Sequence, residues 1–146
     1  MNRTLRHVLA VTAAVAVTLG GVLPAEAGTP ICVPVRPQQH PVIGGQEINV
    51  DVHAEACGAS LTVLEVYAAT TSGRPFTVTA DLYRYRYDGS RGGLKSGRIG
   101  SSGPAYAHLL RTRRPIPHRQ RGHGWDGYVL VRLTVGREVR TIAVML

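Results

Sequence analysis

The sequence is poor in several residue types, and each scarcity excludes a class of protein. Its 146 residues include only two cysteines, one tryptophan, one phenylalanine and one lysine. Two cysteines are too few for a metal site, and at 25 positions apart they are too distant for a Cys-x-x-Cys redox motif. The hydrophobic content of 44% is enough for a packed core and too high for charge-driven disorder. The length fits a single domain.

The chain also lacks a hydrophobic run long enough to span a membrane. The longest uncharged apolar stretch, residues 8–23, has 16 residues, whereas a transmembrane helix needs about 20. Arg3 and Arg6 precede this stretch, and Ala25-Glu26-Ala27 follows it. Ala25 and Ala27 place small residues at positions −3 and −1, which suits a signal peptidase. Residues 1–27 are therefore predicted to be a secretory signal that is removed after Ala27. An uncleaved membrane anchor is the alternative. We expect a secreted bacterial protein with no membrane span after processing.

Both cysteines lie in the part that we expect to be exported, where thiols are not kept reduced. A disulfide between Cys32 and Cys57 is therefore predicted. Closing a loop of this length stabilises a fold by about 3–4 kcal/mol, chiefly by restricting the unfolded chain. The bond would clamp a proline-rich leader, residues 28–45, to a single β domain, residues 46–146. The leader is not expected to form a regular ladder of hydrogen bonds, since its prolines lack the amide hydrogen.

Alternation of apolar and polar residues predicts antiparallel strands along the remaining chain. Residues 46–53 alternate strictly, and residues 61–68 and 76–87 are rich in β-branched and aromatic side chains. In the third of these segments the apolar face changes side near Leu82, which indicates a β-bulge. A further strand is expected at residues 105–112.

The last twenty residues predict a hairpin. Residues 128–135 and 138–145 flank Gly136-Arg137, and glycine in the first position suits a type II′ turn. Counting outward from this turn places Val131 opposite Ile142, Val129 opposite Val144, and Arg132 opposite Thr141.

These segments together predict an all-β fold. Five or six short strands separated by turns are typical of a small antiparallel β-sandwich or barrel, here with one disulfide and two long basic loops. No segment has a convincing helical period. The immunoglobulin pattern is missing, because the single tryptophan, Trp125, lies far beyond both cysteines.

Charge is distributed unevenly, and most basic residues are arginine. Residues 74–121 hold 11 basic and two acidic side chains, whereas the rest of the expected mature chain holds four basic and six acidic ones. Most of these basic side chains lie in two predicted loops, residues 88–103 and residues 111–125. The basic residues singled out as candidate ligand-binding residues are Arg91, Lys95 and Arg98 in the first and Arg111, Arg113, Arg114, Arg119 and Arg121 in the second.

Arginine-rich loops favour binding of an anionic polymer, because the planar guanidinium makes paired hydrogen bonds to phosphate or carboxylate. The candidate partners are a wall polymer, a nucleic acid or an acidic polysaccharide. The alternative is that GC-rich coding supplies arginine wherever a solvated loop needs a polar residue. Tyr83, Tyr85 and Tyr87 alternate with arginines and either stack on sugars or bases, or cover an edge of the core.

No catalytic pattern is present. The sequence has no GxSxG, HExxH or P-loop motif, and the spacing of His118, His123 and Asp126 matches no metal site. The expected function is therefore non-enzymatic binding, with no metal and no cofactor. Two alternatives remain. A small basic secreted nuclease would use Glu65, His108 and Arg111. A protease inhibitor would present Arg113-Arg114-Pro115 or Pro115-Ile116-Pro117 on an exposed loop.

Overall fold

The structure is a computed structural model. It describes residues 28–85, 93–117, 120–121, 124–125 and 127–146. The predicted secretory signal, residues 1–27, lies outside the described residues.

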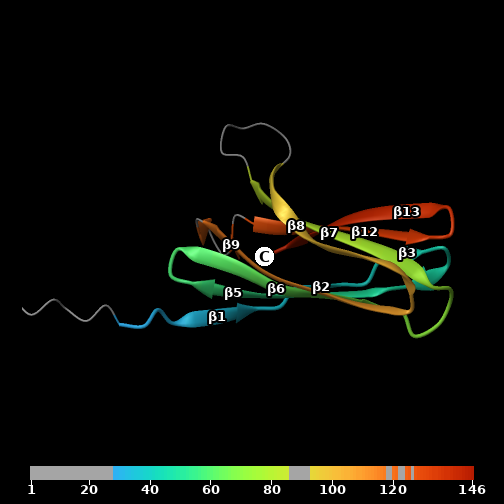
Figure 1. Cartoon of the computed structure of the whole chain (residues 1–146), viewed down its shortest axis with the longest axis horizontal. Helices are drawn as coiled ribbons and strands as arrows, with labels where there is room; N and C mark the ends of the chain where they lie inside the picture. The colour runs from blue at the N-terminus through green and yellow to red at the C-terminus, as the bar shows by residue number, and fades with distance from the viewer. Residues whose placement is uncertain (1–27, 86–92, 118–119, 122–123, 126) are drawn as a thin grey trace, which may run out of the picture.

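Two antiparallel sheets pack face to face as a β-sandwich (Figure 1). The first, called here the β5 sheet, has the order β1 (Cys32–Val35), β5 (Asn49–Cys57), β6 (Ser60–Ala69) and β9 (Ala107–Pro117), and the short β2 (Gln38–Gln39) also pairs with β5. The second, the β12 sheet, has the order β13 (Glu138–Met145), β12 (Gly127–Val135), β7 (Phe76–Tyr85) and β8 (Gly93–Ala105). Two short pairs complete the fold: β3 (Val42–Ile43) with β4 (Gln46–Glu47), and β10 (Gln120–Arg121) with β11 (Gly124–Trp125). The all-β prediction is confirmed.

The core fills the space between the sheets, because alternate side chains of each strand point inward. In β5 the buried positions are every second residue from Val50 to Ala56, and in β7 they run from Phe76 to Leu82 in the same way. Alternate residues of β12 from Val129 to Val135 are buried against them. The alternation in residues 46–53 therefore predicted the correct inward face.

The C-terminal hairpin has the predicted register. Val131 pairs with Ile142, Val129 with Val144, and Arg132 with Thr141. Gly136 has a φ of 59°, while Arg137 has a negative φ, as a type II′ turn requires. The predicted irregularity near Leu82 is also present, since the pairing of β7 with β8 shifts between Ala80 and Asp81 and again between Leu82 and Tyr83.

The disulfide between Cys32 and Cys57 is confirmed, with the two Cα atoms 4.3 Å apart. The expectation that the leader would form no regular ladder is wrong. Its first segment is β1, which pairs with the end of β5 so that Pro34 lies opposite Glu55. Proline is accepted there because β1 is an edge strand, where one row of backbone groups needs no partner strand.

The two basic segments are largely strands, which corrects the prediction of long loops. Gly93 to Gly103 belongs to β8, and Arg111 to Pro117 belongs to β9. A Cβ atom at Gly100 would lie 3.3 Å from Leu110 Cβ, so the glycine lets β9 come close to β8. Glycine and serine therefore indicate close packing here, although in the sequence they resemble a turn. Residues 88–92 of the first predicted loop lie outside the described residues.

Candidate functional site

The basic residues of β8 and β9 lie along one edge of the sandwich, because β8 and β9 are edge strands of the two sheets. The chain crosses from one sheet to the other between these two strands (Figure 1), which then run antiparallel beside each other. A Cβ atom at Gly97 would lie 3.3 Å from Arg114 Nη1, so the Arg114 guanidinium covers the backbone of β8 in the middle of its basic segment. We call this surface the cationic edge, and its residues are Lys95, Arg98, Arg111, Arg113 and Arg114.

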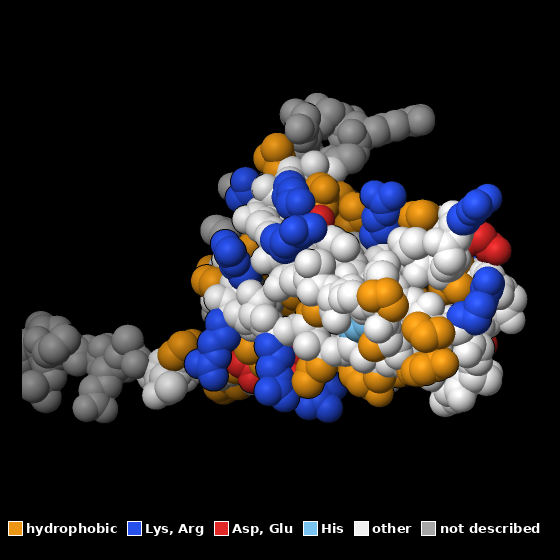
Figure 2. All heavy atoms as spheres, turned by 45° about the vertical axis from the view of Figure 1, so that its right-hand side comes forward, with side chains coloured by type: hydrophobic (Ala, Val, Ile, Leu, Met, Phe, Trp, Pro, Cys, Tyr) orange, Lys and Arg blue, Asp and Glu red, His pale blue; other side chains and the backbone are white. Residues whose placement is uncertain are grey.

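The cationic edge is open to solvent and carries excess positive charge. Figure 2 shows most of the Lys and Arg side chains of one face gathered in its left half, over both sheets, with few acidic side chains among them. Lys95 Nζ lies 2.9 Å from Asp81 Oδ1, and Arg98 Nε lies 3.9 Å from the same oxygen. Arg111 Nε lies 3.9 Å from Glu65 Oε2. These contacts pair two carboxylates with three of the five cations.

Arg113 and Arg114 are the members of the edge that have no acidic partner among the described residues. Both side chains are exposed, and no carboxylate of the described residues lies within 4.0 Å of either guanidinium. An exposed guanidinium of this kind keeps its five donors available for phosphate, sulfate or carboxylate groups.

The other three candidate cations are not placed at the site by the structure. Arg91 and Arg119 lie outside the described residues, and Arg121 belongs to β10, where its backbone pairs with Gly124.

The residues weighed as a metal site, His118, His123 and Asp126, also lie outside the described residues. Within the part that the structure describes, no group of three His, Cys, Asp or Glu side chains could hold a metal ion. No helix in that part is long and apolar enough to cross a membrane.

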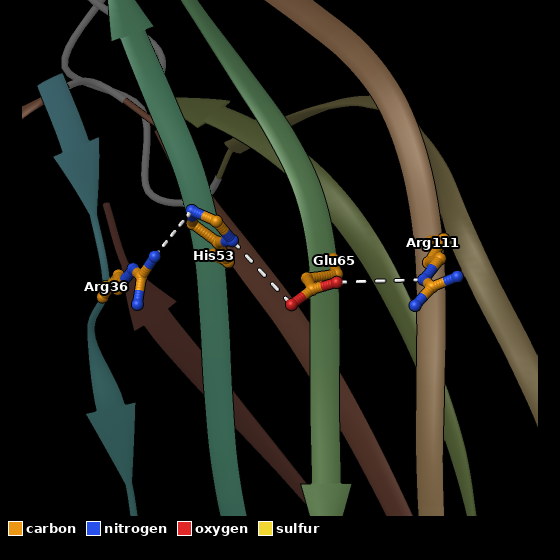
Figure 3. A network of polar contacts seen from close by, with 4 residues as sticks. All are labelled: Arg36, His53, Glu65 and Arg111. Carbon is orange, nitrogen blue, oxygen red and sulfur yellow. Dashed lines mark hydrogen bonds and ion pairs between the residues drawn. The ribbon is translucent and has the colours of Figure 1, made fainter. Parts of the chain in front are cut away.

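A row of polar side chains crosses the outer face of the β5 sheet beside the cationic edge (Figure 3). Arg36 Nη2 lies 3.5 Å from His53 Nε2, and His53 Nδ1 lies 3.8 Å from Glu65 Oε1. The other carboxylate oxygen, Glu65 Oε2, lies 3.9 Å from Arg111 Nε. A guanidinium can only donate, so His53 Nε2 accepts and its Nδ1–H faces the carboxylate. We call these four residues the polar row.

The outer face is hollowed on both sides of Glu65. One hollow of about 410 Å³ is lined by Arg36, Gln38, Asp51, Val52, His53, Glu65 and Tyr67. The other, of about 460 Å³, is lined by Leu64, Glu65, Arg111, Thr112 and Arg113. Because Glu65 lines both, the two hollows meet at this side chain. The second hollow therefore joins the polar row to the cationic edge.

The nuclease alternative named the wrong histidine. His108 is 3% exposed, and its Nε2 lies 2.8 Å from the carbonyl oxygen of Phe76. It points into the core, because His108 and Leu110 share the inward face of β9 whereas Arg111 faces outward. The histidine beside Glu65 is His53, which lies directly opposite it in the neighbouring strand.

The segment considered as an inhibitor loop pairs with β6, with Arg114 opposite Val63 and Pro115 opposite Thr62, so it is a strand.

Tyr83 stacks on Tyr128, with ring centroids 5.3 Å apart, on the outer face of the β12 sheet. Its ring is thus in contact with a neighbour, and it lines a hollow of that face together with Asp81 and with Arg98 of the cationic edge. The Tyr85 side chain and Tyr87 lie outside what the structure describes.

Sequence reasoning missed Arg36, His53 and Tyr67 as site residues. The polar faces of two alternating segments did contain a signal, since Asp51 and His53 share one face of β5 and Glu65 and Tyr67 share one face of β6. The pairing register of four segments was needed to bring them together. In comparisons with known proteins, no family model, no curated protein and no solved structure matches this chain.

Proposed function

We propose that this is an exported, non-enzymatic binding protein that holds an anionic polymer on the cationic edge. The observation that carries the proposal is that basic side chains of β8 and β9 gather along one edge of the sandwich, with Arg113 and Arg114 lacking an acidic partner among the described residues. A polymer with repeated negative charges would contact several of these cations at once. Binding would release counterions and would weaken as the salt concentration rises.

Export is part of the same proposal. The disulfide between Cys32 and Cys57 is consistent with an oxidising environment outside the cytoplasm. The intact mass of secreted material should match a chain that begins at Gly28 and is two hydrogens lighter than the reduced form. Material that retains residues 1–27, or that has two thiols free for alkylation without reduction, would contradict export and processing.

The binding experiment compares two charge-matched double variants on immobilised polygalacturonate and on heparin. The first, Arg113→Ser with Arg114→Ser, removes the two edge cations that have no acidic partner in the part of the chain that the structure describes. The second, Arg137→Ser with Arg140→Ser, removes two exposed cations in the β12–β13 turn and in β13. Strand β13 is the edge strand of the β12 sheet opposite β8. Both lower the net charge by two.

We expect the edge variant to elute at clearly lower salt than the wild type on at least one of the two columns. The control variant should stay close to the wild type, since it changes net charge without changing the edge. Equal retention of the two variants would show that net charge alone determines binding, and the cationic edge would then not be the site.

A further inference from the structure

The hollow that Asp51 and Tyr67 line on the outer face combines hydrogen-bond donors and acceptors around an aromatic ring. Asp51 and Glu65 offer carboxylate acceptors, and the Arg36 guanidinium offers donors. Tyr67 lines the same hollow and is 40% exposed. A sugar ring has hydroxyl groups that both donate and accept, and an apolar face that packs on an aromatic ring. Few polar groups beside an aromatic side chain in a concave site are typical of small-ligand recognition.

The charge of this hollow differs from that of the cationic edge. Its two carboxylates outnumber its one guanidinium, that of Arg36, so the hollow has no excess of positive charge. A nucleic acid carries one negative phosphate per nucleotide and would bring phosphates close to Asp51 and Glu65, which repel them. A polymer that fits both surfaces needs neutral hydroxyl groups as well as acidic groups.

The two surfaces are continuous. Glu65 lines both hollows, and Arg111 and Arg113 of the cationic edge line the second one. The hollows extend over β5, β6 and β9, whose neighbouring strands lie about 4.8 Å apart. A chain lying across these strands would pass from His53 on β5 over Glu65 on β6 to Arg111 on β9, and Tyr67 lies two residues from Glu65 along β6.

From this arrangement we infer that the outer face of the β5 sheet binds the sugar units of an acidic polysaccharide, whose charged groups lie on the cationic edge. The inference rests on the proposed function and names its ligand class. Asp51 and Glu65 accept hydrogen bonds from sugar hydroxyls, and Tyr67 packs against a sugar ring. Arg111 and Arg113 bind the acidic groups.

Removing one carboxylate separates this inference from simple charge attraction. Asp51→Ala removes a negative charge, so any purely electrostatic binder of polyanions should bind more tightly after the change. If Asp51 instead accepts hydrogen bonds from sugar hydroxyls, binding to the polysaccharide should weaken. Glu55→Ala is the matched control: Glu55 lies on the same strand and the same face, is similarly half-buried, and does not line either hollow.

The probes are polygalacturonate and single-stranded RNA, measured by calorimetry or by retention, with thermal unfolding to confirm that each variant is folded. We expect Asp51→Ala to weaken binding of polygalacturonate about tenfold, the loss typical of one charge-assisted hydrogen bond. Glu55→Ala should leave that binding unchanged or slightly tighter. Neither variant should weaken RNA binding. Tyr67→Ala should weaken polygalacturonate binding and Tyr67→Phe should restore it.

The possible results are distinguishable. Asp51→Ala that binds polygalacturonate as tightly as Glu55→Ala would overturn the sugar site, while the Arg113→Ser/Arg114→Ser comparison would still decide the proposed function. Tighter binding of RNA than of polygalacturonate, with Tyr67→Ala affecting only RNA, would assign the face to nucleic acid and contradict the inference. If the wild type binds neither polygalacturonate nor heparin nor RNA, the proposed function fails first and the inference fails with it.

Discussion

The hairpin of β12 and β13 and the strand β8 lie in the same sheet but become strands for different reasons. The hairpin has eight cross-strand pairs without a register shift, and a two-residue turn joins its strands. Strand β8 contains four glycines and three serines, and its pairing with β7 shifts three times. The hairpin therefore depends on local sequence, whereas β8 depends on its neighbours.

The neighbours of β8 explain how such a sequence can form a strand. Ile99 is its buried side chain, and Leu110 of β9 lies over Gly100, where a larger residue would occupy the same space. Most other side chains of β8 are exposed. A strand that contributes little to the core can carry charged residues at low cost to stability. This is where Lys95 and Arg98 lie, beside the arginines of β9.

The largest effect on stability is expected in the hairpin. Val131 is fully buried in the central strand β12, and Val131→Ala should lower the free energy of unfolding by about 1–3 kcal/mol through lost burial and a small cavity. Thr134→Ala, which is half-buried near the turn, should cost under about 0.5 kcal/mol. Urea unfolding of both variants measures the difference. Equal costs would contradict the hairpin register.

The next effect tests whether glycine in β8 serves close packing. Gly100→Val should cost about 1–2 kcal/mol, because its Cβ already lies 3.3 Å from Leu110 Cβ and its methyl groups would crowd the core. Gly103→Val introduces the same side chain three residues later, where a Cβ has no atom within 4 Å. It should be neutral or slightly stabilising. If both variants gain stability from the β-branched residue, packing against β9 does not explain the glycines.

The smallest effect is expected at the cationic edge. Arg113→Ser with Arg114→Ser should change the free energy of unfolding by less than about 0.5 kcal/mol, since exposed charges contribute little to folding. Thermal unfolding of the double variant beside the wild type measures this. A loss comparable to that of Val131→Ala would mean that these arginines are structural, and any loss of polymer binding by the variant could not then be assigned to direct contact.

The sequence was sufficient for the features that depend on neighbouring residues. It predicted the all-β class, the register of the hairpin and the disulfide, because alternation, turn chemistry and the redox environment act locally or generally. It failed for β8, since glycine and serine favour turns locally. Only the packing of β8 against its neighbouring strands makes this segment a strand. The segment of β9 that carries Arg113 and Arg114 was also mistaken for a loop, because its prolines and charged residues are typical of loops.

The polar row needed information that no single segment contains. The pairing of β5 with β6 shifts between His53 and Ala54, and the pairing of β6 with β9 shifts between Val63 and Glu65. These shifts decide that Glu65 lies between His53 and Arg111. The nuclease alternative named His108 with Glu65 and Arg111 without a register that places them together, and His108 faces the core.

The salt dependence of polygalacturonate binding tests the role of the cationic edge most directly. On a log–log plot of affinity against salt concentration, each cation that neutralises an acidic group contributes about one unit of slope. We predict that Arg113→Ser with Arg114→Ser flattens the slope by about two units, while Arg137→Ser with Arg140→Ser leaves it parallel to the wild type. Three parallel lines would contradict the account, because the arginines of β9 would then make no contact with the polymer.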